Sequence, residues 1–252
     1  MKTGLEGKTV MVTGPVRNIG RMTALMMAEE GANLLLCTRQ SKERLEEVAH
    51  ECESIGARVV VDLCDVADRD QVQGFVKKGL AEFGHVDVLV NNATFRSQHP
   101  LLDTIPEEWH RNIAVNLDGP FNTCQAVLPN MIERRWGRII NYSGISPYLG
   151  GGAAKAMAKL GIVGFTRGVA RENGRYGVTA NCIGPGSIDV ERDPDLGQVG
   201  GPPTATNLRE TLPIPRQGTP EEIASLAVYL SSEYAAYITG QCYLMNGGAY
   251  FS

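Results

Sequence analysis

The feature that most constrains the fold of this chain is a regular alternation of short apolar runs with longer amphipathic stretches. The apolar runs are too short for helices and are typical of strands buried on both faces. We expect strands at Thr9–Thr13, Asn33–Cys37, Arg58–Val61, Val86–Val90, Arg138–Tyr142, Thr179–Ile183 and Gln241–Leu244. We expect helices at Arg21–Glu30, Lys42–Ile55, Arg69–Phe83, Glu107–Glu133, Ala153–Asn173 and Pro220–Leu230. Because this alternation implies right-handed crossovers, the sequence predicts an α/β fold, a single doubly wound domain with a seven-stranded parallel sheet and helices on both faces.

Residues that end or begin helices support these boundaries. Gly31, Gly56 and Gly84 follow three of the helices, where a left-handed residue is favoured, and Thr219-Pro220 opens another. The whole chain, 1–252, is therefore expected to form one domain. Its long irregular stretch is rich in Gly, Pro and Asp and follows a strand, where ligands bind in such sheets. We interpret residues 187–212 as a substrate loop.

Charge and composition exclude several classes of function. The net charge of −4 leaves no basic surplus for the phosphate contacts that dominate nucleic-acid binding. There is no secretory h-region at the first residues and no apolar run of membrane-spanning length, so we expect a cytoplasmic protein without membrane contact. The six cysteines are scattered singly and no histidine stands at ligand spacing, so we expect no metal.

The segment Thr13–Gly20 lies between the first strand and the first helix and contains two glycines. In this context a tight turn presents helix N-terminal amides to a pyrophosphate. Other motifs follow in order along the chain: Asp65-Val66, Asn91-Asn92-Ala93, Asn116 within 114–117, Pro185-Gly186 and 237–240. Together they resemble the short-chain dehydrogenase/reductase family over essentially the whole chain.

The resemblance implies a Rossmann-type domain that binds a nicotinamide dinucleotide. It assigns cofactor binding to Gly14, Arg17, Asn18, Ile19, Gly20, Arg39, Asp65, Val66, Asn92, Ala93, Lys159, Gly186 and Ile188. The second strand ends Cys37-Thr38-Arg39, without the carboxylate that would bond the ribose 2′-hydroxyl of NAD. Arg39 and Arg17 are instead suited to a 2′-phosphate, so we expect NADP, with NAD as the alternative.

The catalytic pattern of the family is altered here. Family members use Ser, Tyr and Lys with an Asn, and the tyrosine is the acid or base. Lys159 matches the family lysine, but Lys155 stands where the tyrosine is expected and Gly144 where the second serine is expected. The intervening segment is also about two residues shorter than is usual in the family. Three other residues depart from the family pattern. Asn18 replaces the middle glycine of the phosphate turn, Thr94 replaces the glycine after Asn91-Asn92-Ala93, and Val190 replaces a threonine that usually bonds the carboxamide. We expect the Asn18 side chain to crowd the pyrophosphate.

Three hypotheses fit this pattern. The first is an NADP-linked oxidoreductase acting on a carbonyl/alcohol pair of a small molecule, with Lys155, or a nearby phenol such as Tyr148 or Tyr142, as acid or base. In this hypothesis Asn116 and Lys159 keep the positioning roles that they have in the family, and Ser143 polarises the substrate carbonyl. Arg96 and His99 would contact an anionic substrate. The second is a non-catalytic subunit that pairs with an active relative, since the family forms homodimers and homotetramers through its two long helices. The third is a lyase or isomerase with Lys155 as the reactive amine.

Overall fold

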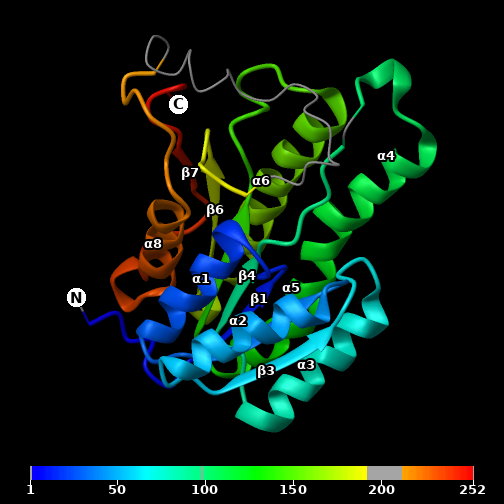
Figure 1. Cartoon of the computed structure of the whole chain (residues 1–252). Helices are drawn as coiled ribbons and strands as arrows, with labels where there is room; N and C mark the ends of the chain where they lie inside the picture. Colours follow the sequence, from blue (N-terminus) through cyan, green and yellow to red (C-terminus); the bar gives the residue numbers. More distant parts are fainter. Residues whose placement is uncertain (1, 98, 192–211, 252) are drawn as a thin grey trace.

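A computed structural model describes residues 2–97, 99–191 and 212–251, and its core is one parallel sheet of seven strands (Figure 1). The strand order is β3-β2-β1-β4-β5-β6-β7, and the order reverses between β1 and β4. The strands are β1 (Thr9–Thr13), β2 (Asn33–Thr38), β3 (Val59–Leu63), β4 (Val88–Asn91), β5 (Gly137–Tyr142), β6 (Val178–Pro185) and β7 (Cys242–Met245). In open α/β sheets ligands bind at the carboxyl ends of the strands beside such a reversal. The predicted doubly wound α/β fold is confirmed.

Helices cover both faces of the sheet (Figure 1). They are α1 (Asn18–Glu29), α2 (Lys42–Ser54), α3 (Arg69–Phe83), α4 (Pro106–Ile113), α5 (Gly119–Glu133), α6 (Ala153–Asn173) and α8 (Pro220–Ser231). Alternate residues of one strand enter different layers, as Val10 and Val12 pack with α1, α2 and α8, whereas Met11 packs with α3 and α5. Every residue of β1 is buried, which explains why its sequence is continuously apolar rather than alternating.

The glycines and the Thr219-Pro220 pair predicted to mark helix ends do so in the structure, although α1 begins at Asn18 rather than at Arg21. Gly31, Gly56 and Gly84 all have positive φ angles, which cost a glycine little. Thr219 caps α8: its side chain accepts a hydrogen bond from the Glu222 amide, and the Glu222 carboxylate accepts one from the Thr219 amide. This reciprocal arrangement is a capping box, and it fixes the point at which the chain turns into α8.

One predicted helix is divided in the structure. The stretch Glu107–Glu133 forms α4, a π-helical turn at Ala114–Asp118 and then α5. Within the turn, Asn116 Nδ2 donates to the carbonyl oxygen of Asn112 at 3.0 Å, which in a regular helix would accept the Asn116 amide. A side chain inserted in this way widens the helical ladder. Single-turn π bulges of this kind are frequent at functional sites.

Most of the predicted substrate loop, 192–211, lies outside the described residues. The six cysteines carry no disulfide. In the described ranges, no group of His, Cys, Asp and Glu side chains is placed to hold a metal ion. No helix that the structure describes is long and apolar enough to cross a membrane.

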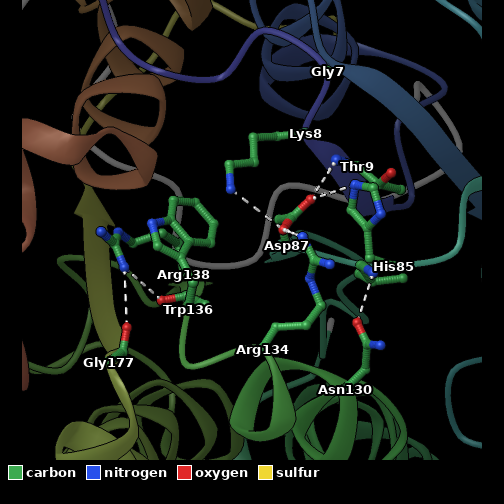
Figure 2. Close-up of polar contacts among 12 residues, drawn as sticks. Gly7, Lys8, Thr9, His85, Asp87, Asn130, Arg134, Trp136, Arg138 and Gly177 are labelled. Carbon is green, nitrogen blue, oxygen red and sulfur yellow. Dashed lines mark hydrogen bonds and ion pairs between the residues drawn. The ribbon is translucent and has the colours of Figure 1, made fainter.

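A buried carboxylate ties three strands together at the amino edge of the sheet (Figure 2). The Asp87 side chain is fully buried and accepts the Thr9 amide at 2.9 Å. Around it lie two cations and an imidazole, with Lys8 Nζ at 3.6 Å, an Arg134 guanidinium nitrogen at 3.6 Å and His85 Nε2 at 3.1 Å. The main chain of Asp87 bonds β1 and the start of β5. This cluster is at the end of the sheet opposite the site described next, so we assign it to stability.

Candidate active site

The turn after β1 is held by the residues that follow β4. Thr13 Oγ1 accepts the amides of Asn92 and Ala93, each at 3.0 Å. Asn92 Nδ2 donates to the carbonyl oxygens of Thr13 at 2.9 Å and Gly14 at 2.7 Å. The two strand ends that flank the reversal of the sheet are thereby locked together, and the turn keeps one shape.

Both glycines of this turn are required by its geometry. Gly14 has a φ of +64°, and a Cβ on Gly20 would lie 2.3 Å from Asn92 Nδ2 and 2.7 Å from the Gly14 carbonyl oxygen. Arg17, the N-cap residue of α1, makes no side-chain capping hydrogen bond, so the first amides of the helix suit an external acceptor. A helix N-terminus beside a turn with glycines at Gly14 and Gly20 suits a phosphate group, because the amides and the helix dipole both favour negative charge. The residues present therefore fit a dinucleotide.

Asn18 opens α1 with a φ of +54° and bonds a distant segment. Its Oδ1 accepts the amide of Glu191 at 2.8 Å and its Nδ2 donates to the Glu191 carbonyl oxygen at 2.9 Å. We expected the Asn18 side chain to crowd the pyrophosphate. In the structure it is instead bonded to the segment after β6. That segment is also held from its other side, where Ile188 pairs with Gly218 as an isolated bridge. At its start, Gly186 approaches Asn246 so closely that no Cβ would fit.

At the other end of the predicted dinucleotide site, Arg39 is exposed beside the end of β2. It donates to Gln40 at 3.3 Å and, in the part of the chain that the structure describes, has no carboxylate partner. One carboxylate oxygen of Asp65 accepts a hydrogen bond from the Arg111 guanidinium at 2.8 Å, and the other accepts one from the Ala67 amide at 3.0 Å. Val66 is buried against Gly119.

Lys155 and Lys159 lie one turn apart on α6. Lys159 Nζ donates to the Tyr142 carbonyl oxygen at 3.1 Å. Burial, followed by the positive charge of Lys155, lowers the pKa of Lys159 to about 8. Lys155 is an exposed residue, yet partial desolvation and then the charge of Arg96 lower its pKa too. Neither lysine has an ion-pair partner among the described residues, so the lysine pair gives up protons more readily than ordinary lysines do.

The other predicted catalytic residues lie around this pair but have other partners. Ser143 is buried and its hydroxyl donates to the Lys159 carbonyl oxygen at 2.7 Å. Tyr148 directs its hydroxyl at Cys242 Sγ, 3.9 Å away, and burial raises its pKa. The phenol of Tyr142 lies toward α1, where its oxygen is 3.1 Å from the Thr23 hydroxyl. None of these hydroxyls is better placed than Lys155 to release a proton.

The side-chain amide of Asn116 is hydrogen-bonded to the segment that follows β4. Its Oδ1 accepts from the Thr94 hydroxyl at 2.7 Å, and its Nδ2 donates to the Phe95 carbonyl oxygen at 2.8 Å. Nδ2 also bonds the Asn112 side-chain oxygen at 2.7 Å. The Asn116 side chain therefore fixes the course of residues 94–95, and Arg96 follows directly.

Two residues that position the site were missed in the sequence. Thr13 reads as the last residue of a buried strand, and nothing in its neighbourhood indicates that its hydroxyl serves two amides. Glu191 lies 173 positions from Asn18, so only the fold brings them together. An asparagine in place of a turn glycine was the available signal, because asparagine tolerates a left-handed backbone and carries both a donor and an acceptor.

Comparison with known proteins places this site in a family. A sequence profile described as "Enoyl-(Acyl carrier protein) reductase" matches residues 14–250. The chain is 37% identical over 245 residues to the 3-oxoacyl-[acyl-carrier-protein] reductase FabG of Staphylococcus epidermidis, covering 96% of this chain and 99% of that one. It is 35% identical over 250 residues to the FabG of Thermotoga maritima, covering 97% and 98%.

Solved structures agree with the sequence matches. A short-chain dehydrogenase/reductase from Serratia marcescens superposes with a TM-score of 0.88 at 33% identity, covering 97% of this chain and 98% of that one. A short-chain type dehydrogenase/reductase from Mycobacterium marinum gives 0.87 at 29% identity, covering 98% and 97%. The glycine turn, the N-terminus of α1 and the two α6 lysines thus lie in a chain that belongs to the short-chain dehydrogenase/reductase family of oxidoreductases.

Proposed function

We propose that this chain is an NADP-dependent oxidoreductase that interconverts a carbonyl and an alcohol, with Lys155 as its proton donor and acceptor. The observation that carries the proposal is the lysine pair on α6, which has no carboxylate partner among the described residues: burial and Arg96 lower the pKa of Lys155, and burial, Lys155 and Arg96 lower that of Lys159. We assign Lys155 to the position of the family tyrosine and Gly144 to that of the second serine. The names of the relatives make a 3-oxoacyl thioester the first substrate to test.

In the direction of reduction, Lys155 donates the proton and Lys159 supplies positive charge. The cofactor, when bound, supplies the hydride. A nearby cation stabilises the alkoxide that forms as the carbonyl accepts it, and such stabilisation is strong where water is partly excluded. The Lys155 ammonium then protonates this oxygen. Partial burial and the charge of Arg96 favour that transfer because they disfavour the protonated form of Lys155.

The remaining predicted catalytic residues have positioning roles in this proposal. Asn116 holds residues 94–95, and with them the start of the segment carrying Arg96 and His99. Ser143 donates to the main chain of Lys159 and so fixes α6 against β5. Tyr148 bounds the site on the β7 side. We therefore assign proton transfer to Lys155 rather than to Tyr148.

For the cofactor we propose NADP bound along Gly14, Arg17, Ile19 and Gly20, with Arg39 at the 2′-phosphate. The predicted adenine contact of Asp65-Val66 and the ribose contact of Asn92-Ala93 remain part of this proposal. So does cofactor binding by Gly186 and Ile188. Two features support it: the N-terminus of α1, where Arg17 makes no side-chain capping hydrogen bond, and the exposed guanidinium of Arg39 with no carboxylate beside it in the described ranges. NAD is the alternative cofactor.

Replacing Arg39 with alanine should weaken NADPH binding about tenfold and leave NADH binding within twofold, because only NADPH carries the 2′-phosphate. Fluorescence titration of the purified protein with each nucleotide measures both dissociation constants. Arg58→Ala is the matched control, since Arg58 is another exposed cation but is paired with Glu82. Equal losses for both nucleotides in Arg39→Ala would contradict the assignment.

The rate of reduction should fall as the pH rises above about 8, because Lys159 then loses the positive charge that stabilises the alkoxide, and it should fall further once Lys155 loses the proton it must donate. The pKa of Lys159 is lowered to about 8, and that of Lys155 is lowered in the same direction, so deprotonation begins below the ordinary lysine range. Alcohol oxidation should rise over the same interval, since it needs the free amine. A kcat/KM profile in both directions from pH 6 to 10 tests this, and a reduction rate that stays flat to pH 10 would contradict it.

We further propose that the chain works in the cytoplasm as a homodimer or homotetramer through α5 and α6. Small residues on α6 suit close packing, and Ala153 lies on its exposed surface. The alternative assembly is a hetero-oligomer with an active relative, in which this chain need not react. Activity of the purified chain alone separates the two, because a non-catalytic subunit has none.

A further inference from the structure

Two cysteines face each other across the last two strands of the sheet. Cys182 of β6 and Cys242 of β7 are register partners in the parallel pairing, so both side chains leave the sheet on one face. Neighbouring strands are about 4.8 Å apart, which is within the range of Cα separations that a disulfide bridges. The two thiols also hydrogen-bond to each other.

The surroundings of Cys242 favour its thiolate. Its sulfur accepts a hydrogen bond from Cys182 and another from the Tyr148 hydroxyl at 3.9 Å. These two bonds, with the nearby charge of Arg167, lower the pKa of Cys242 to about 7. The residue is half-buried on the edge strand and lines a groove of about 820 Å³ that it shares with Ile188 and Tyr250. A thiolate in this place is both reactive and reachable.

Cys182, by contrast, is fully buried and held in place. Its sulfur lies 3.0 Å from the Thr166 hydroxyl of α6, and its thiol also points at the Ile162 carbonyl oxygen at 3.8 Å. Burial and the thiol–thiol bond keep it protonated, since both raise its pKa. Because Cys182 is held beside Cys242, it can react with an oxidised Cys242. Because it is buried, reagents in solvent do not reach it.

We propose that Cys242 is a peroxide-reactive thiol and that Cys182 resolves its oxidised form to a Cys182–Cys242 disulfide. The Cys242 thiolate attacks one oxygen of a hydroperoxide, the O–O bond breaks, the other oxygen leaves as hydroxide or alkoxide and takes up a proton from water, and Cys242 becomes a sulfenic acid. The Cys182 sulfur then attacks that sulfur and displaces its hydroxyl, which leaves as water with the Cys182 proton. Two thiols lose two electrons to one peroxide, which for hydrogen peroxide yields two waters.

A second pair of neighbouring cysteines in the chain serves as an internal control for this proposal. Cys37, at the end of β2, and Cys64, just after β3, are also hydrogen-bond partners, and their bond lowers the pKa of Cys64. Their residues, however, are 0% and 2% exposed, whereas Cys242 is partly exposed. Because a peroxide must reach a thiolate to oxidise it, the Cys37–Cys64 pair should resist while the Cys182–Cys242 pair reacts.

The test is peroxide treatment of the folded full-length protein at pH 7.5, alkylation of the remaining thiols and peptide mapping by mass spectrometry. We expect a Cys182–Cys242 disulfide that dithiothreitol reverses, with Cys37 and Cys64 alkylated. In Cys182→Ser the reaction should stop at a sulfenic acid on Cys242, which dimedone traps. In Cys242→Ser, Cys182 should stay reduced.

Three results would overturn the proposal. They are Cys242 unreacted at peroxide concentrations that oxidise free cysteine, oxidation of Cys37 and Cys64 at the same rate, or a dimedone adduct on Cys242 in the wild-type protein with no disulfide. Because none of these measurements uses NADPH or a carbonyl substrate, they are independent of the proposed function.

Discussion

Replacing Lys155 with methionine should lower kcat for carbonyl reduction by a factor of about 10²–10⁴, the usual contribution of a positioned acid or base. Dissociation constants for NADPH should stay within about twofold, because Lys155 lies on α6, whereas the proposed phosphate contacts come from the turn before α1. The assay follows NADPH absorbance with a 3-oxoacyl thioester such as acetoacetyl-coenzyme A. The same preparation, titrated with NADPH, gives the binding constant.

Two further variants separate proton transfer from charge. Lys77→Met removes another exposed helix lysine and should leave kcat unchanged. Lys155→Arg keeps the positive charge but has no proton to release near neutral pH, so it should be nearly as slow as Lys155→Met. Full activity in Lys155→Arg would show that Lys155 binds the substrate through its charge rather than transferring a proton. Full activity in Lys155→Met would show that Lys155 has no part in the mechanism.

A paired substitution restores the residues that the family uses. Gly144→Ser has room, because a Cβ there would meet only Lys159 Cγ at 3.9 Å. Combined with Lys155→Tyr, it should recover at least part of the activity lost in Lys155→Met. That gain would show that Lys155 and Gly144 occupy the positions assigned to them.

Replacing Asp87 with alanine should destabilise the fold by about 3 kcal/mol without slowing turnover by the protein that remains folded. The substitution leaves the Thr9 amide buried without an acceptor, which costs about 1–3 kcal/mol. It also removes the carboxylate from among Lys8, His85 and Arg134, but these side chains are partly exposed and can turn to water, so the lost ion pairs add only about 1 kcal/mol. Urea unfolding followed by circular dichroism measures the change in free energy of unfolding.

Asp62→Ala is the matched control for this measurement. Asp62 pairs with Lys78 at 2.8 Å, but both side chains are half exposed, and exposed pairs contribute about 0–1 kcal/mol. A loss at Asp87 no larger than the loss at Asp62 would show that the buried cluster in Figure 2 does not stabilise the sheet as we describe.

The sequence predicted the sheet well because its signals are local. The strands are continuous apolar runs, and α3 and α6 begin and end where their caps and periodicity predict. The prediction was wrong in treating 107–133 as one regular helix. The π turn there arises from the bond of Asn116 to Asn112, which replaces a main-chain bond, and side-chain pattern alone does not reveal it.

Much less of the site was predictable from pattern. That Lys155 and Lys159 share a helix face follows from their spacing, but burial and Arg96, from another segment, set the direction of their pKa shifts. The expectation that Asn18 crowds the pyrophosphate assumed a side chain with no other partner, whereas Glu191 supplies one. The Ser143 hydroxyl was expected to face a substrate carbonyl, and in the structure it bonds the main chain of α6.

The most direct test of the proposed function is titration of the purified wild-type chain with NADPH and NADH, following the change in nucleotide fluorescence and the melting temperature. We predict saturable NADPH binding at micromolar concentration, at least tenfold weaker NADH binding, and a higher melting temperature with NADPH, since a ligand that binds only the folded state stabilises it. Failure of either nucleotide to bind at millimolar concentration would contradict an NADP-dependent oxidoreductase, whatever Lys155 does.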